Sequence, residues 1–245
     1  MLLKIFKKLF YLILALSFVV FILLLLDGIH QYPSPPPPSR LLLRKPTKTL
    51  VPSGSELSFN DLKENFGKNK ELPKGYEEQA LLALAHYPEL ENVPIRFEIT
   101  ETLIPLASRP DILSVLLPWK KRTYCIIISS KSIESLEPIL LQNLSFNAQV
   151  GVLGHELGHT VYYLDKASIE HAGIAARYLT LSFRKSFERN TDQRTIEHGL
   201  GYQLLAWSEE VQAAFNGDSE AITMDNTYYN PQEINNEITK LKIYK

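Results

Sequence analysis

The chain has 245 residues, with 26 Lys+Arg against 27 Asp+Glu and a hydrophobic content of 45%. A net charge of -1 without a long basic run excludes the electrostatic surface of a nucleic-acid-binding protein, so no nucleic-acid partner is expected. The single cysteine, Cys125, excludes a disulfide-stabilised scaffold. The apolar content is that of a globular protein and argues against wholesale disorder.

An uncharged apolar run extends from Leu9 to Leu26. As a helix it would be about 27 Å long, close to the thickness of the hydrocarbon core of a bilayer. Because Lys4, Lys7 and Lys8 precede it, the positive-inside rule predicts a cytoplasmic N-terminus over residues 1–8 and a transmembrane signal anchor over residues 9–26. The remainder would then be extracytoplasmic, on a single-pass membrane protein in contact with the lipid bilayer. The alternative is a protein secreted after signal-peptide cleavage, although signal peptides usually have apolar regions of only about 7 to 15 residues.

A proline-rich linker is expected over residues 27–52. Residues 31–39 contain five prolines, which favour an extended polyproline II spacer. Residues 53–245 are then long enough for one domain with a sizeable core.

Apolar residues recur at helical spacing at the start of this domain and through most of its second half. The expected helices are Tyr76–His86, a helix capped by Asn147 and running to about Asp165, a second region at Ile169–Phe183, a third from Ser186, and a last one capped by Asn230. Two strands are expected between them, at Ile95–Thr100 and Tyr124–Ser129. The pattern predicts an α+β domain: a small sheet followed by a mainly helical half.

The sequence His155-Glu156-Leu157-Gly158-His159 carries the strongest chemical signal. On a helix, the two histidines lie one turn apart on one side, so their imidazoles can share one zinc ion. Glu156 can then reach a water on the metal and act as its general base. The alternative interpretation, a hydrogen-bonded pair of core histidines, needs no metal.

A catalytic zinc ion needs a third protein ligand and an open position. The metzincin pattern would place glycine and histidine where this chain has Tyr162 and Asp165, although Asp165 remains possible as a carboxylate ligand. A better candidate pair is Glu188 and Asp192, which are one turn apart on a predicted helix. Glu188 would bind the metal, and Asp192 would accept a hydrogen bond that fixes the tautomer of His155. The same pair would also suit an ordinary solvated helix face.

The His-Glu-Leu-Gly-His motif, followed by a later Glu-x-x-x-Asp, resembles the gluzincin peptidases. These include thermolysin-like enzymes and the membrane zinc peptidases related to the CAAX prenyl endopeptidases. The resemblance covers residues 149–192 and implies a zincin-like domain in which His155, His159 and Glu188 bind one Zn²⁺ ion. It further implies that Glu156 is the general base and that Asp192 supports the ligands. Thr191 stands where the CAAX-related group usually has alanine, and one predicted anchor replaces several membrane spans.

Other parts of such a site are less defined by the sequence. Tyr178, His171 and Arg177 are candidates for stabilising the oxyanion, whereas His198 and Tyr202 would lie too far along a continuous helix. The strand expected at residues 124–129 is the candidate partner for an extended substrate.

Together these features predict a membrane-anchored, zinc-dependent peptidase acting on a peptide or protein substrate. One alternative is a catalytically inactive zincin-like binding or scaffold protein tethered to the membrane. Another is a structural anchor protein without a metal.

Overall fold

The computed structural model describes residues 2–29, 44–52, 58–117, 121–215 and 226–245. Within the first of these ranges, side chains are described from Phe6 to Ile22. The polyproline spacer expected at residues 31–39 lies outside the described residues.

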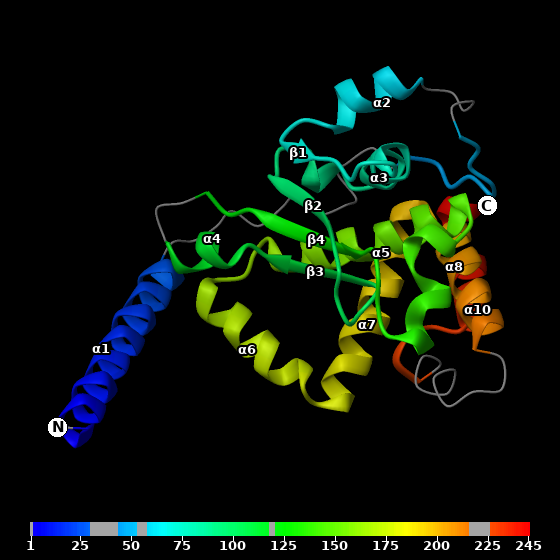
Figure 1. Ribbon diagram of the computed structural model, residues 1–245. Coiled ribbons are helices and arrows are strands. Elements are labelled where there is room, and N and C mark those ends of the chain that lie inside the picture. The colour runs from blue at the N-terminus through cyan, green and yellow to red at the C-terminus, as the bar shows by residue number, and fades with distance from the viewer. Residues whose placement is uncertain (1, 30–43, 53–57, 118–120, 216–225) are drawn as a thin grey trace.

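A small mixed sheet forms one layer of the domain (Figure 1). Its strands are β1 (Lys70–Glu71), β2 (Ile95–Thr100), β3 (Leu106–Pro110) and β4 (Tyr124–Ser129), in the order β1-β2-β4-β3. β2 is parallel to β1 and β4, whereas β3 runs antiparallel to β4. The bounds of β2 and β4 confirm the two predicted strands.

Most of the described chain outside the sheet is helical, so the predicted α+β class is confirmed. The α-helices are α1 (Leu2–Ile29), α2 (Phe59–Phe66), α3 (Glu77–Leu84), α4 (Ile112–Leu116), α5 (Phe146–Tyr163), α6 (Ser168–Tyr178), α7 (Leu181–Thr195), α8 (Gly201–Ala214) and α10 (Pro231–Lys240). A π-helical turn, η5 (Ile196–Leu200), joins α7 to α8. Short 3-10 helices occur at η2 (Pro88–Leu90), η3 (Glu134–Ile139), η4 (Leu141–Asn143) and η6 (Lys242–Tyr244).

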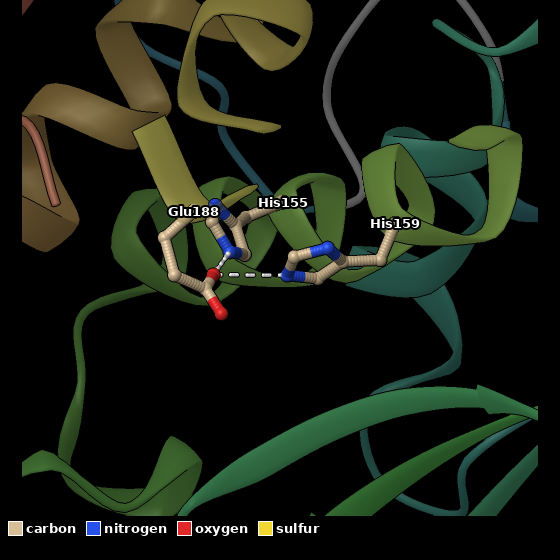
Figure 2. Close-up of side chains that lie close together, drawn as sticks. All are labelled: His155, His159 and Glu188. Atoms are coloured by element: carbon tan, nitrogen blue, oxygen red, sulfur yellow. Dashed lines mark hydrogen bonds and ion pairs between the residues drawn. The ribbon is translucent and has the colours of Figure 1, made fainter. Parts of the chain in front are cut away.

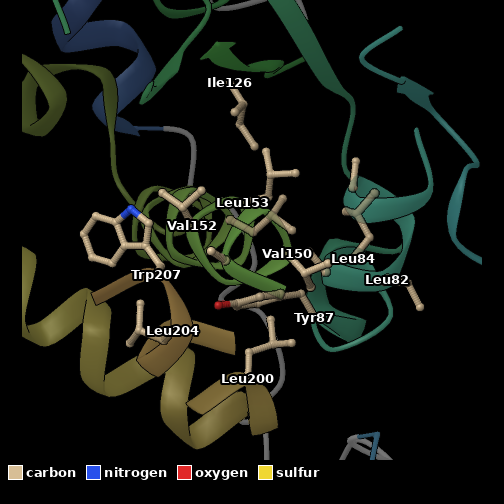
Figure 3. Close-up of a cluster of buried hydrophobic side chains, with 14 of the residues drawn as sticks. Leu82, Leu84, Tyr87, Ile126, Val150, Val152, Leu153, Leu200, Leu204 and Trp207 are labelled. Atoms are coloured by element: carbon tan, nitrogen blue, oxygen red, sulfur yellow. The ribbon is translucent and has the colours of Figure 1, made fainter. Parts of the chain in front are cut away.

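α5 is the central helix of the core (Figure 3). It packs against α3, α7, α8 and β3, and Val150, Leu153 and Leu157 are fully buried along it. Two glycines allow this close packing. A Cβ atom at Gly151 would lie 2.2 Å from the backbone oxygen of Gln203 on α8, and one at Gly158 would lie 3.0 Å from Thr191 Cγ2 on α7. The cost of glycine within a helix is therefore offset by the approach of neighbouring helices.

Three boundaries differ from the sequence expectation. Ser145, not Asn147, caps α5, because its Oγ accepts a hydrogen bond from the backbone N–H of Ala148, while the Asn147 side chain exchanges two hydrogen bonds with Leu50. The expected helix over residues 169–183 ends at Tyr178, and α7 begins at residue 181 instead of near residue 186. By contrast, the capping box at Asn230 is present as expected.

The segment leading into the domain was assigned to the linker but packs on the helical half. Leu50 is buried, and the backbone oxygen of Thr47 accepts a hydrogen bond from Gln203 on α8. The folded unit therefore includes Thr47 and Leu50, which precede residue 53.

α1 extends from the body beside α4 and α6, and it contacts both (Figure 1). Among the residues that the structure describes, no helix combines the length and apolar content needed to cross a membrane. The transmembrane span expected over residues 9–26 is therefore not supported by this part of the chain, in which the described side chains of α1 end at Ile22.

Candidate metal centre

The two histidines of the motif lie on the same side of α5 and meet a carboxylate from α7 (Figure 2). Glu188 Oε2 lies 3.0 Å from His155 Nε2 and 3.0 Å from His159 Nε2. All three side chains are buried. The structure thus brings together the three residues expected to bind a metal, although Glu188 lies 33 and 29 residues after the two histidines in the sequence.

The other nitrogen of each imidazole faces an acceptor on α7. His155 Nδ1 donates to Asp192 Oδ1 at 2.8 Å. His159 Nδ1 lies 3.1 Å from Thr191 Oγ1, whose own hydrogen is donated to the backbone oxygen of Phe187. Thr191 therefore accepts from His159. Both rings consequently carry a hydrogen on Nδ1 and point Nε2 at Glu188, and a hydrogen on Nδ1 is what metal-ligating histidines need.

Electrostatics within the cluster depend strongly on burial and on the close carboxylates. Burial disfavours the charged ring of His155, but Asp192 and Glu188 outweigh this effect and raise its pKa to about 10. Burial likewise opposes ionisation of Glu188, yet the imidazoles of His159 and His155 hold its pKa well below the usual range. The carboxylates of Glu188 and Asp192 thus favour a positive charge at His155, beside the place where a cation would sit.

Glu156 lies beside the cluster without belonging to it. Its Oε2 atom is buried and, among the described residues, has no hydrogen-bond partner. Burial raises the pKa of this carboxyl group. A buried carboxylate oxygen with a free lone pair next to three potential ligands is suited to accept a proton from a molecule bound there.

A cleft of about 320 Å³ opens onto these residues. Its walls come from β3, α5, α6 and α7, and both Glu156 and Glu188 line it. β3 is an edge strand, so one side of its backbone is not paired within the sheet. The expectation that residues 124–129 form the substrate-facing strand is wrong, because β4 lies between β2 and β3 and is paired on both sides.

The residues expected to stabilise the oxyanion, and the possible ligand Asp165, lie in different places. Tyr178 and His171 line the cleft, and the Tyr178 hydroxyl donates to Glu188 Oε1 at 2.5 Å. Arg177 does not line the cleft and instead lies over the ring of Phe183. Asp165 pairs with Lys166 and is outside the metal cluster.

His198 and Tyr202 also lie elsewhere. His198 Nε2 pairs with Glu89 Oε1 at 2.7 Å, and its ring stacks on Tyr87. Tyr202 packs against Tyr244.

Two tyrosines near the carboxyl end belong to the site without any signal in the sequence. Tyr228 lines the cleft and packs against the ring of His155, with the ring centroids 5.6 Å apart. The backbone N–H of Tyr229 donates to Asp192 Oδ2 at 2.8 Å. Thr191 was also missed as a partner of His159, although its spacing of three residues from Glu188 places it on the same helix face.

Comparisons with known proteins give no match: no family model, no curated protein and no solved structure is similar to this chain at a significant level. Any function therefore has to be argued from the site itself.

Proposed function

We propose that the chain is a zinc-dependent peptidase that hydrolyses peptide bonds, with His155, His159 and Glu188 as metal ligands and Glu156 as general base. The observation that carries the proposal is the meeting of two imidazole Nε2 atoms with one carboxylate oxygen, beside a buried carboxylate that has no partner among the described residues. Two nitrogens and one carboxylate, with a fourth position open, form a typical donor set of catalytic zinc.

The distances from the carboxylate to the two imidazoles fit that donor set. In a tetrahedron with metal–ligand bonds of about 2.0 Å, neighbouring donors are separated by about 3.3 Å. The two separations of 3.0 Å from Glu188 Oε2 are close to this value. A zinc ion held there would polarise the scissile carbonyl group and make a water molecule acidic.

The side chains around the ligands suggest how the reaction would proceed. Glu156 would take a proton from the attacking water and deliver it to the departing amine. Tyr178, whose hydroxyl donates to Glu188 Oε1, would turn this O–H group to the developing oxyanion when substrate binds. The free edge of β3 would pair with the backbone of an extended peptide and hold it across the cleft.

Attachment of the domain to a membrane remains part of this proposal. It is supported by the apolar run over residues 9–26 with its preceding lysines, and by the exposed apolar side chains along α1. Extraction of cell membranes at alkaline pH would test it, because an anchored chain stays with the lipid.

Two measurements on the purified full chain test the peptidase proposal. The wild-type chain should contain about one zinc ion per molecule, and His155→Ala should contain almost none. The wild-type chain should cleave an unfolded protein, whereas Glu156→Gln should bind zinc and cleave at least about 100-fold more slowly. A zinc-loaded wild-type chain no more active than Glu156→Gln would instead support the inactive binding or scaffold protein. A chain without zinc would support the structural anchor.

A further inference from the structure

An exposed apolar face on α6 is not explained by the metal centre. α6 forms one wall of the cleft through His171, Ile174 and Tyr178. On its other side, Ile169 is 39% exposed, and Leu179 in the following turn is 85% exposed. Exposing apolar side chains to water is unfavourable, and a contiguous exposed apolar face is typical of a surface that contacts a partner or a membrane.

Small residues complete the face between these two positions. Ala172, Gly173 and Ala176 are exposed, and a Cβ atom at Gly173 would contact nothing within 4 Å in the described part of the chain. Leu181, at the start of α7, extends the face and is 72% exposed. One side of α6 and the turn after it are thus open and almost wholly apolar.

The neighbouring elements continue this surface. α1 contacts both α6 and α4, and Figure 1 shows it leaving the domain beside them. On α4, Ile112 is 60% exposed and Leu113 is 57% exposed. On α1, large apolar side chains are exposed along the helix from Phe6 to Ile22 and on all of its sides. The least exposed of them, Ile22, is 38% exposed. A helix apolar on all sides is typical of a lipid environment.

Basic side chains border the exposed leucines. Arg177 precedes Leu179 by two residues and Arg184 follows Leu181 by three, and their guanidinium groups lie over the rings of Phe183 and Tyr178. Apolar side chains framed by arginine are typical of elements that lie in the surface of a membrane, where guanidinium groups meet lipid phosphates.

We infer that the exposed face of α4, α6 and the turn at residues 179–181 rests on the lipid bilayer, so that the cleft opens at the membrane surface. The partner is the lipid surface itself, whether α1 crosses the bilayer or lies within it. If the chain is the proposed peptidase, its substrates are peptide segments held at the bilayer surface, such as the membrane-proximal parts of membrane proteins. The lipid contact does not depend on that activity.

The lipid contact can be measured in the full chain carrying Glu156→Gln, reconstituted into phosphatidylcholine vesicles. An environment-sensitive fluorophore would be attached to Leu113→Cys or Leu179→Cys, with Leu14→Cys on α1 as the lipid control and Asn235→Cys on α10 as the aqueous control. The native Cys125 is buried, and the parent chain shows whether it reacts. We expect spin-labelled lipids to quench the probes at positions 14, 113 and 179, but not at 235.

Each other result overturns the inference. Quenching at position 14 alone would mean that only α1 meets lipid. An apolar probe signal at position 179 without lipid quenching, together with a disulfide crosslink between two Leu179→Cys chains, would mean that a second copy of the chain covers the face. Absence of quenching at positions 14, 113 and 179 would place the whole surface outside the lipid.

A kinetic measurement tests the substrate class separately. One cleavable peptide would be offered either free or tethered to vesicles by an acyl chain. Replacing Leu179 and Leu181 by serine should slow cleavage of the tethered peptide about tenfold and leave that of the free peptide within about twofold. Ile133→Ser, at a position 48% exposed, is the matched control and should change neither rate. Equal effects on both peptides, or none, would refute the substrate class, whereas an inactive wild type would refute the proposed function and leave the quenching result intact.

Discussion

The hydrogen bond from His159 to Thr191 offers a sharp test of how α7 tunes the site. In Thr191→Val the side chain keeps its shape, but His159 Nδ1, 3.1 Å from the Thr191 oxygen, loses its acceptor. Both residues are buried, with Thr191 at 1% exposure, so water cannot easily replace the hydroxyl group. A buried N–H group left without a partner costs about 1–3 kcal/mol. Every 1.4 kcal/mol corresponds to a factor of ten in affinity. We therefore expect zinc to bind about 10- to 100-fold more weakly, the range found when such supporting bonds to ligand histidines are removed.

The assay is competition for zinc between the protein and a chromophoric chelator at fixed pH. Thr195→Val is the matched control, because Thr195 is also a buried threonine on α7 and donates to the backbone of Thr191, one turn away from the imidazoles. Thr191→Ser restores the hydroxyl group and should recover most of the affinity. If Thr191→Val binds zinc as tightly as the wild type, or if Thr195→Val weakens binding equally, the hydrogen bond does not tune the metal.

Three further predictions follow from other contacts. Tyr178→Phe should lower kcat at least about tenfold in zinc-loaded protein, as measured by steady-state cleavage, and an unchanged kcat would exclude its hydroxyl from the oxyanion site. Gly151→Ala should lower the free energy of unfolding by about 2 kcal/mol or more, because the new Cβ atom meets the backbone of α8. Gly173→Ala, on the open side of α6, should raise the free energy of unfolding by about 0.5–1 kcal/mol. Urea unfolding measures both variants, and equal effects would contradict the close packing at Gly151. Burial lowers the pKa of His86 to about 4, so the unfolded chain takes up the proton first as the pH falls. Relative to His86→Gln, the free energy of unfolding should therefore drop by about 3 kcal/mol between about pH 6.5 and pH 4, and parallel pH profiles would refute this.

The sequence predicts the grouping of His155, His159 and Glu188 because helix periodicity sets the direction in which each pair of residues points. His155 and His159 are one turn apart on α5, and Glu188 and Asp192 are one turn apart on α7, so each pair points in one direction once its helix forms. The packing of α7 against α5 is then all that is needed to bring the two pairs together. The resemblance to gluzincins predicts that Glu188 joins the two histidines.

The cleft was less predictable because its parts depend on contacts between distant segments. The sequence does not predict β3 because Pro105 precedes it and Pro110 is its last residue, and prolines are typical of loops as well as of edge strands. Periodicity also identifies β4 without revealing the order of the strands, so its central position could not be read from the chain. Tyr228 and Tyr229 carry no motif and reach the site only through the tertiary fold.

α7 supplies more than Glu188, because it also fixes the orientation of both imidazoles through Thr191 and Asp192. The geometry of the His155–His159–Glu188 cluster therefore depends on how far apart α5 and α7 lie. That distance is set inside the motif itself, at Gly158, where any side chain would begin 3.0 Å from Thr191 Cγ2. A larger residue at this position would push Thr191 away and displace Glu188 and Asp192 with it, since all three belong to one rigid helix. The glycine between the two histidines thus has a structural reason that is as specific as the chemistry of the histidines themselves.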